Sequence, residues 1–199
     1  MFQIRIHGRG GQGVVTAADL LAYAAFKEDK HAQAFPSFGS ERTGAPVVSY
    51  CRISTRPIRS HEPVLAPDAV IVQDPTLLTA IDVFSGLSSG GYALINSARP
   101  FSTFEIDPAT VQAVPLEHRL TVPATDLAME HLGRPLPNAV LLGAFTAVTD
   151  VVSLAAVCEA VSDRFPGVLG ERNIEAARAA HEIIADKIAL MTKEDHGAA

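Results

Sequence analysis

A cluster of glycines near the start of the chain constrains its fold more than any other feature. An alternating apolar run over residues 4–7 breaks into a turn, and a helical pattern begins at Val14. The glycines of this turn are Gly8, Gly10, Gly11 and Gly13. Glycine tolerates a positive φ and has no Cβ, so a strand–turn–helix of this kind can expose backbone N–H donors at the positive end of the helix dipole. The pattern predicts a site that suits phosphate or another anion.

The same glycines match the dinucleotide-binding pattern G-x-G-x-x-G in the context which that pattern requires. A Rossmann site is normally completed by an acidic residue about 20 residues further on, which binds the ribose. The second predicted strand, around residues 33–35, carries no acid. Three interpretations therefore stay open: a stand-alone nucleotide-binding module, glycines that only allow a helix to pack closely on a strand, and a turn that contacts a phosphate-bearing ligand or a partner chain.

Length and composition indicate one α/β domain that packs against other subunits. The 199 residues suffice for one well-cored domain, which we place at 1–191 with a flexible tail at 192–199. Hydrophobic residues make up 48% of the chain and charged residues only 19%, which favours a buried interface. The 16 basic and 22 acidic residues give a net charge of −6 with no block of either sign, so nucleic acid binding is not expected.

No membrane span or export signal is expected. The apolar segment 139–161 is interrupted by threonines and acids, and Ser153 is a plausible N-cap at a break between two helices. The first residues already form a predicted core strand instead of a charged leader, so we expect a cytoplasmic protein.

The chain offers few residues for chemistry of its own. Cys51 and Cys158 are far apart in the sequence, whereas an iron–sulfur cluster normally needs four thiolates. No hydrolase, Walker or zinc-protease motif is present, and the seven histidines lack ligand spacing. We therefore predict no catalytic and no metal-binding residue, and any electron carriers would belong to other chains.

Hydrophobic patterns predict a single three-layer α/β/α domain that is Rossmann-like, with a mixed or mostly parallel sheet and a helical C-terminal part. Strands are expected at 2–7, 31–35, 47–53, 69–74, 92–96 and 103–106, and helices at 14–27, 125–132, 138–149, 154–165 and 174–191. The strand at 47–53 follows its predecessor by too short a loop for a crossover helix, which is why the sheet is expected to be mixed.

The loop over residues 36–46 is a second candidate site. It places a dense polar set between two apolar strands, comprising Ser37, Ser40, Glu41, Arg42 and Thr43. Arg42 can offer a planar fork to a phosphate or carboxylate, with Glu41 to orient it. The alternative is a surface turn with a solvated ion pair. Because the loop leaves the C-terminal side of its strand, as the glycine turn does, we expect the two segments to form one surface.

These two segments together resemble the gamma subunit, or gamma domain, of the 2-oxoacid:acceptor oxidoreductases, of which pyruvate:ferredoxin oxidoreductase is the best-known member. The resemblance rests on Gly8-Arg9-Gly10-Gly11-Gln12-Gly13-Val14, on residues 32–46 and on the later segment 137–144, so it spans most of the chain. Thr43 departs from the pattern, because arginine is expected there in many relatives.

The resemblance implies a helper subunit of an enzyme that converts a 2-oxo acid and coenzyme A to acyl-CoA, CO₂ and reduced acceptor. Thiamine diphosphate with Mg and iron–sulfur clusters would be held by alpha, beta and delta-type partner subunits, and ferredoxin or an NAD-linked flavin subunit would accept the electrons. This chain would pack on the thiamine-binding subunits and help to shape the coenzyme A entrance. The expected contact residues are Gly8, Arg9, Gly10, Gly11, Gln12, Gly13, Ser37, Ser40, Glu41 and Arg42.

Overall fold

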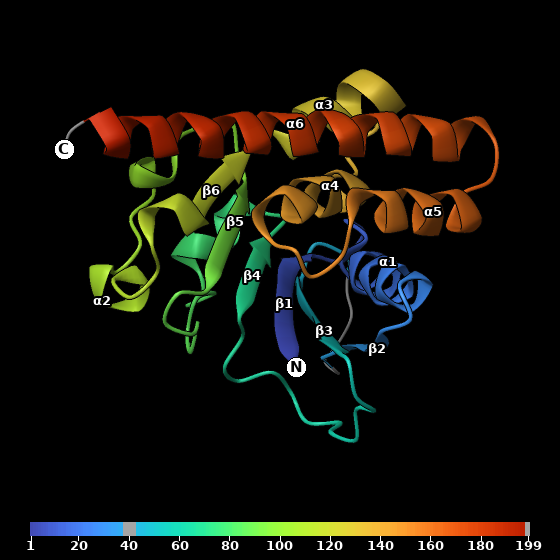
Figure 1. The fold of residues 1–199 in the computed structure, drawn as a ribbon, viewed down its shortest axis with the longest axis horizontal. Coiled ribbons are helices and arrows are strands. Elements are labelled where there is room, and N and C mark those ends of the chain that lie inside the picture. The colour runs from blue at the N-terminus through green and yellow to red at the C-terminus, as the bar shows by residue number, and fades with distance from the viewer. Residues whose placement is uncertain (38–42, 198–199) are drawn as a thin grey trace.

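The computed structural model describes residues 1–37 and 43–197, and within them the strands form one mixed sheet (Figure 1). The order across the sheet is β2-β3-β1-β4-β5-β6. The strands are β1 Phe2–Arg9, β2 His31–Pro36, β3 Pro46–Ser54, β4 Ala69–Val72, β5 Tyr92–Asn96 and β6 Arg119–Val122.

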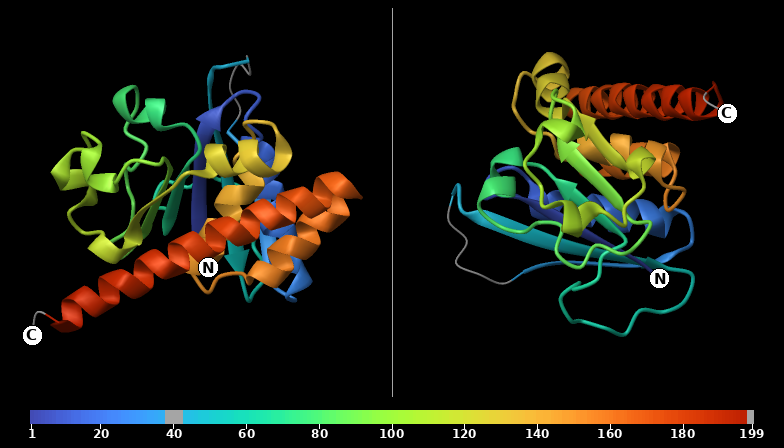
Figure 2. Two further views of the ribbon diagram at one scale, coloured as in Figure 1. Left: turned by 90° about the horizontal axis from the view of Figure 1, so that it is seen from above. Right: turned by 90° about the vertical axis from the view of Figure 1, so that its left-hand side faces the viewer.

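The helices gather in the second half of the chain, as expected. They are α1 Val14–Lys27, η1 Pro75–Thr79, η2 Phe101–Thr103, α2 Pro108–Val111, η3 Leu116–His118, α3 Ala124–Leu132, α4 Asn138–Val148, α5 Leu154–Arg164 and α6 Val168–Gly197. The two views in Figure 2 show the longer helices on one side of the sheet, with α6 lying across α4 and α5.

Strand directions confirm the mixed sheet and determine which strands are neighbours at its β2 edge. β1, β4, β5 and β6 run parallel, whereas β3 is antiparallel to β1 and β2 is antiparallel to β3. The strand that follows α1 therefore does not pair with β1. It takes the sheet edge, and the antiparallel β3 lies between them, because the segment joining β2 to β3 is too short to cross over the sheet.

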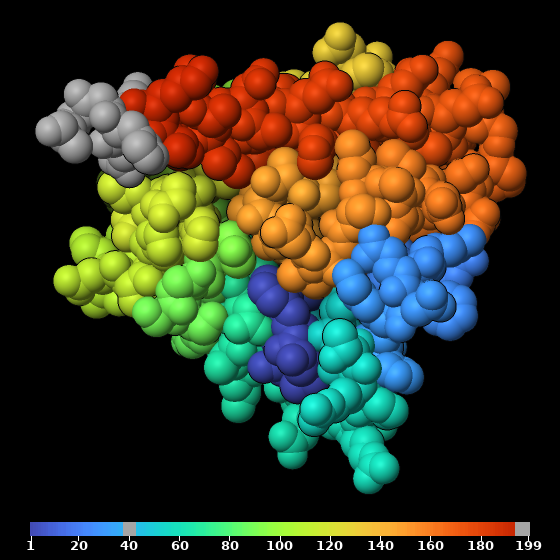
Figure 3. All heavy atoms as spheres, viewed as in Figure 1, coloured from blue at the N-terminus to red at the C-terminus, as the bar shows by residue number. Residues whose placement is uncertain are grey.

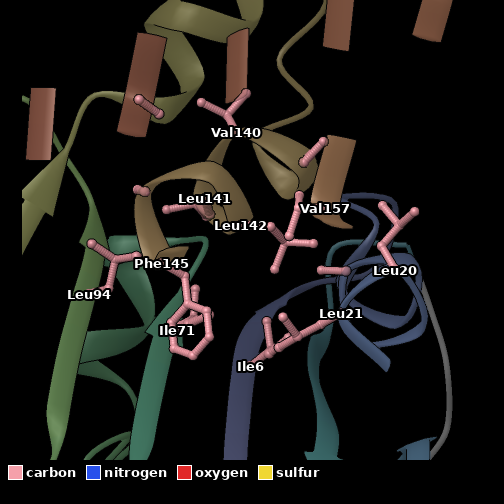
Figure 4. Close-up of a cluster of buried hydrophobic side chains, with 14 of the residues drawn as sticks. Ile6, Leu20, Leu21, Ile71, Leu94, Val140, Leu141, Leu142, Phe145 and Val157 are labelled. Carbon is pink, nitrogen blue, oxygen red and sulfur yellow. The ribbon is translucent and has the colours of Figure 1, made fainter. Parts of the chain in front are cut away.

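The main core lies between the sheet and the longer helices (Figure 4). Phe145 of α4 reaches down towards Ile71 of β4, and Leu142 lies between the sheet and α5. These side chains are at most 1% exposed. Burial of each large apolar side chain contributes about 1.5–3 kcal/mol to stability, so α4 anchors the helical layer to the sheet.

Short helices and loops cover the opposite face of β4 and β5. Val70 and Val72 of β4 and Ile95 of β5 pack there against a second cluster that includes Phe84 and Val111. The expected three layers are present in this part of the sheet, and the second helical layer is thin because η1, η2 and α2 are each one turn or little more.

One expected strand is wrong and another was missed. The segment 103–106 forms no strand, and the last strand of the sheet is β6 instead. Phe104 and Ile106 alternate as in a strand, but both pack onto the second cluster as parts of a loop. Alternation of apolar and polar residues indicates that one side of a segment is buried. It does not show that the segment is hydrogen-bonded to a neighbouring strand.

The predicted N-cap at Ser153 is confirmed, since its Oγ accepts a hydrogen bond of 3.1 Å from the backbone N of Ala156. We expect Ser153→Ala to lower the free energy of unfolding by about 1 kcal/mol, because one N–H at the start of α5 loses its acceptor. Urea denaturation followed by circular dichroism would measure this. An unchanged midpoint would show that water replaces the hydroxyl without cost.

The C-terminal boundary stays a prediction. α6 continues without interruption past residue 191, and the flexibility expected for residues 192–199 is not tested by this helix. Among the described residues, no helix is both long enough and apolar enough to span a membrane.

Candidate functional site at the glycine turn

The glycine turn joins the end of β1 to the start of α1. Gly11 and Gly13 have φ values of 94° and 73°, a conformation that side-chain-bearing residues rarely adopt. Gly8 has a different role, because it still belongs to β1, and a Cβ there would lie 2.6 Å from Cγ2 of Val14. The close-packing interpretation therefore holds at Gly8, and the positive-φ interpretation holds at Gly11 and Gly13.

The end of the second candidate loop is hydrogen-bonded to this turn, as expected. Gly10 donates from its backbone N to the carbonyl of Ala45 at 2.9 Å and accepts from the N of Gly44 at 3.1 Å. Gly10 and Thr43 also form an isolated parallel bridge. The contact arises through β3, which starts beside the end of β1, and not through β2. The described part of the loop and the turn therefore form one surface.

Asp74, two residues after the end of β4, contacts the side chains of Gln12 and Arg9. Its carboxylate accepts a hydrogen bond of 2.9 Å from Nε2 of Gln12 and lies 3.2 Å from Nε of Arg9. Oε1 of Gln12 in turn accepts from the backbone N of Arg9 at 2.8 Å. Burial alone would raise the pKa of Asp74, but hydrogen bonds from Thr76 and Gln12 and the Arg9 charge outweigh it and lower the pKa. The carboxylate is therefore ionised near neutral pH.

Arg9 links all three parts of this site. Its Nη1 donates to the carbonyl of Gly44 at 3.0 Å, and its Nη2 donates to Oγ1 of Thr76 at 2.8 Å. Together with the Asp74 contact, these bonds connect the glycine turn, the start of β3 and η1. The Arg9 side chain is still 31% exposed and lines the hollow described next.

Beside the turn lies a hollow of about 490 Å³, within the usual volume range for small-ligand sites. It is lined by Arg9, Gly10, Gly11, Gly13, Val14, Val15, Thr43 and Val47. The N-terminus of α1 opens into it at Gly13, which has no side chain to cap the first helical turn. The Asn138 side chain at the start of α4 packs against Gly13, because a Cβ on Gly13 would lie 2.6 Å from its Nδ2.

The structure places the predicted contact residues unevenly. Gly8 and Arg9 are the last residues of β1, and residues 10–13 form the turn, in which Asp74 accepts a hydrogen bond from the Gln12 side chain. Ser37 is exposed, and its backbone N donates to the carbonyl of Val48 at 2.8 Å, outside the lining of the hollow. Ser40, Glu41 and Arg42 lie outside the described residues, so their expected role stays a prediction.

Three residues in or beside the site, Asp74, Thr76 and Asn138, were not assigned to it from the sequence. Asp74 had a signal, since an acid directly after a buried parallel strand lies at the edge where ligands of open α/β sheets gather. Asn138 had none of its own, because its place beneath Gly13 depends on how α4 packs against α1.

The two cysteines do not fit an iron–sulfur cluster. Cys51 and Cys158 are both buried, with Cys51 in the core between the sheet and α1, and burial raises the pKa of the Cys51 thiol. A protonated, enclosed thiol is a poor metal ligand. Within the described part of the chain, no group of three or more His, Cys, Asp or Glu side chains is placed to hold a metal ion.

The fold and this site define a class: an α/β domain whose glycine turn lies beside an antiparallel strand, with no metal-binding cluster among the described residues. The family model of pyruvate ferredoxin/flavodoxin oxidoreductase matches residues 3–183. The chain belongs to this family, which confirms the resemblance seen in the two motifs.

Individual relatives agree with this assignment over nearly their full length. The pyruvate synthase subunit PorC of Methanothermobacter marburgensis is 48% identical over 92% of this chain and 97% of its own. The common subunit gamma of the pyruvate/ketoisovalerate oxidoreductases of Thermococcus litoralis is 47% identical over 92% and 96%. The crystal structure of pyruvate oxidoreductase subunit PORC from Thermotoga maritima is 36% identical over 91% and 95%, with a TM-score of 0.74.

Proposed function

We propose that this chain is the gamma subunit of a multi-subunit 2-oxoacid:acceptor oxidoreductase and that its glycine turn helps to shape the coenzyme A entrance. The enzyme would convert a 2-oxo acid and coenzyme A to acyl-CoA and CO₂ and pass electrons to ferredoxin or to an NAD-linked flavin subunit. The observation that carries the proposal is the hollow at the start of α1, where an uncapped helix N-terminus and Arg9 face the same space. Both attract the phosphates of coenzyme A.

In this proposal the cofactors belong to the partners. Thiamine diphosphate with Mg would be bound by alpha and beta subunits, and the iron–sulfur clusters by a delta-type subunit, since two buried cysteines cannot supply four thiolates. This chain would bind the coenzyme's phosphates and position neighbouring chains. The name of the Thermococcus litoralis relative, a subunit common to two oxidoreductases, fits a subunit that does not select the oxo acid. The cytoplasmic location stays a prediction.

A stand-alone NAD-binding module is not favoured. In a Rossmann fold the strand after the first helix pairs in parallel with β1, and its acidic end binds the ribose. Here the antiparallel β3 occupies that position. Gly44 and Ala45, just before β3, form backbone hydrogen bonds with Gly10 of the turn. The family assignment points the same way.

Charged substitutions at Thr43 test the proposed contact with coenzyme A. Thr43 is exposed and lines the hollow. In the complete complex we expect Thr43→Glu to raise the KM for coenzyme A about threefold and Thr43→Arg to lower it by a similar factor, with kcat unchanged, because an exposed charge contributes up to about 1 kcal/mol. Steady-state kinetics at low ionic strength would measure both.

The matched control is Thr55→Glu, also an exposed threonine, which lies just beyond the end of β3 at the opposite end of the sheet. It should leave the KM for coenzyme A unchanged. Equal KM values for Thr43→Glu and Thr43→Arg would contradict the coenzyme contact. Weakened assembly without a change in KM would instead identify the turn as a pure assembly scaffold.

A further inference from the structure

A second hollow lies far from the glycine turn, between the outer side of β6 and the C-terminal half of α6. Its volume is about 580 Å³, and β4 and β5 separate β6 from β1 in the sheet. Figure 3 shows the part of α6 drawn in red along the upper edge of the molecule, with the yellow-green part of the chain beneath it. The lining residues that carry the argument are Phe101, Leu116, Arg119, Lys187, Leu190 and Met191.

The groove is apolar and open. Leu116 is 70% exposed and Leu190 is 61% exposed, which is unusual for leucines that share one concave surface. Exposed apolar side chains are common singly, but a contiguous group around a hollow marks a site of association. Both leucines and Met191 would be covered by a single segment lying between η3 and α6.

Among the described residues that line the groove, the only charged side chains, Arg119 and Lys187, are basic. Nζ of Lys187 donates to the carbonyl of Thr121 at 2.7 Å, and burial lowers the pKa of this ammonium group. Nε and Nη2 of Arg119 both donate to the carbonyl of Val114. Among the side chains that the structure describes, no carboxylate lies within ion-pair distance of Lys187 or Arg119.

A half-buried ammonium group that contacts only a carbonyl lacks its best partner, because buried charges in proteins are normally paired. We propose that this groove docks an apolar segment of another subunit of the same complex, and that this segment carries a carboxylate which pairs with Lys187. The inference uses the family assignment and does not depend on the role proposed for the glycine turn. It gives the chain a second interface at the β6 edge of the sheet.

Charge disfavours a second copy of this chain as the occupant. A two-fold dimer through this groove would place the same patch on both sides, so Lys187 and Arg119 of one copy would face those of the other. Like charges across an interface cost several kcal/mol, whereas a carboxylate from a different chain complements both groups.

The test is the affinity of this chain for the other purified subunits of its own complex. We expect Lys187→Glu to raise the dissociation constant about thirtyfold or more, because it replaces a partly desolvated charge pair by repulsion. Leu190→Glu should have a similar effect and spare the fold, since that side chain is mostly exposed. The control is Arg178→Glu, the same charge change at an exposed position of α6 outside the groove lining, which should leave the affinity unchanged.

A photo-reactive amino acid at position 190 identifies the occupant in the assembled complex. Cross-links to a segment of another subunit that contains Asp, Glu or a C-terminal carboxylate would support the proposal, and reversing that charge should restore the affinity of Lys187→Glu. Unchanged affinity for both variants, cross-links only to this chain, or self-association that Lys187→Glu abolishes would each overturn it. Failure of the Thr43 variants would leave these results unaffected, so the two proposals fail separately.

Discussion

Gly143→Ala is expected to lower the free energy of unfolding by about 3 kcal/mol, although alanine is the better helix former. Gly143 lies in the middle of α4, where α6 crosses it, and a Cβ there would lie 2.7 Å from the Cα of Ala177 and closer still to its carbonyl. The obstacle is the backbone of a packed helix and not a flexible side chain, so the two helices must move apart. Chemical denaturation of the isolated chain would measure the loss.

Gly133→Ala separates this clash from backbone strain. Gly133 ends α3 with a φ of 67°, and a Cβ there would meet nothing within 4 Å. We expect a cost of about 1 kcal/mol from the left-handed backbone alone. If Gly143→Ala cost no more than Gly133→Ala, the close approach of α4 and α6 would not control stability.

Local signals in the sequence were sufficient for the turn. Positive φ at Gly11 and Gly13 and the start of α1 at Val14 follow from residue type and spacing over a dozen positions. The same holds for Ser153, whose cap bond spans three residues. Both features depend on neighbours in the chain, so a single sequence can predict them.

The missed features depend on distant parts of the chain. Asp74 holds Gln12 from 62 positions away, and Asn138 reaches Gly13 only because α4 packs against α1. β6 has only four residues, and it is recognised as a strand because it pairs in parallel with β5. At 103–106 the apolar pattern predicted burial correctly and predicted a strand wrongly. Pairing with a neighbouring strand depends on the whole sheet and not on the local pattern.

Acid is expected to destabilise this chain strongly through His7, the strand residue just before the glycine turn. His7 is 5% exposed, and neither ring nitrogen has a hydrogen-bond partner among the described residues. Burial, with a smaller contribution from the nearby Arg5 charge, lowers the pKa of His7 to about 3. The folded chain therefore keeps this ring neutral over most of the acidic range.

The direction in which the free energy of unfolding changes with pH follows from the protons that each state binds. An unfolded histidine binds a proton below a pKa of about 6.5, whereas folded His7 does so only near pH 3, so the unfolded state binds more protons between these values. Stability from this residue is complete above pH 6.5 and is lost as pH falls, by about 1.4 kcal/mol per unit and about 3 kcal/mol by pH 4.

The measurement compares wild type with His7→Leu in urea at pH 7, 6, 5 and 4. Leucine matches the apolar neighbours across the sheet, Val48 and Val72, and has no proton to bind. Acidic side chains titrate in both proteins, so their contribution cancels in the difference between the two unfolding free energies. From pH 7 to pH 4 the unfolding free energy of His7→Leu should rise by about 3 kcal/mol relative to that of the wild type. A difference that does not change with pH would mean that folded His7 accepts a proton as readily as the unfolded chain, and that water reaches its ring.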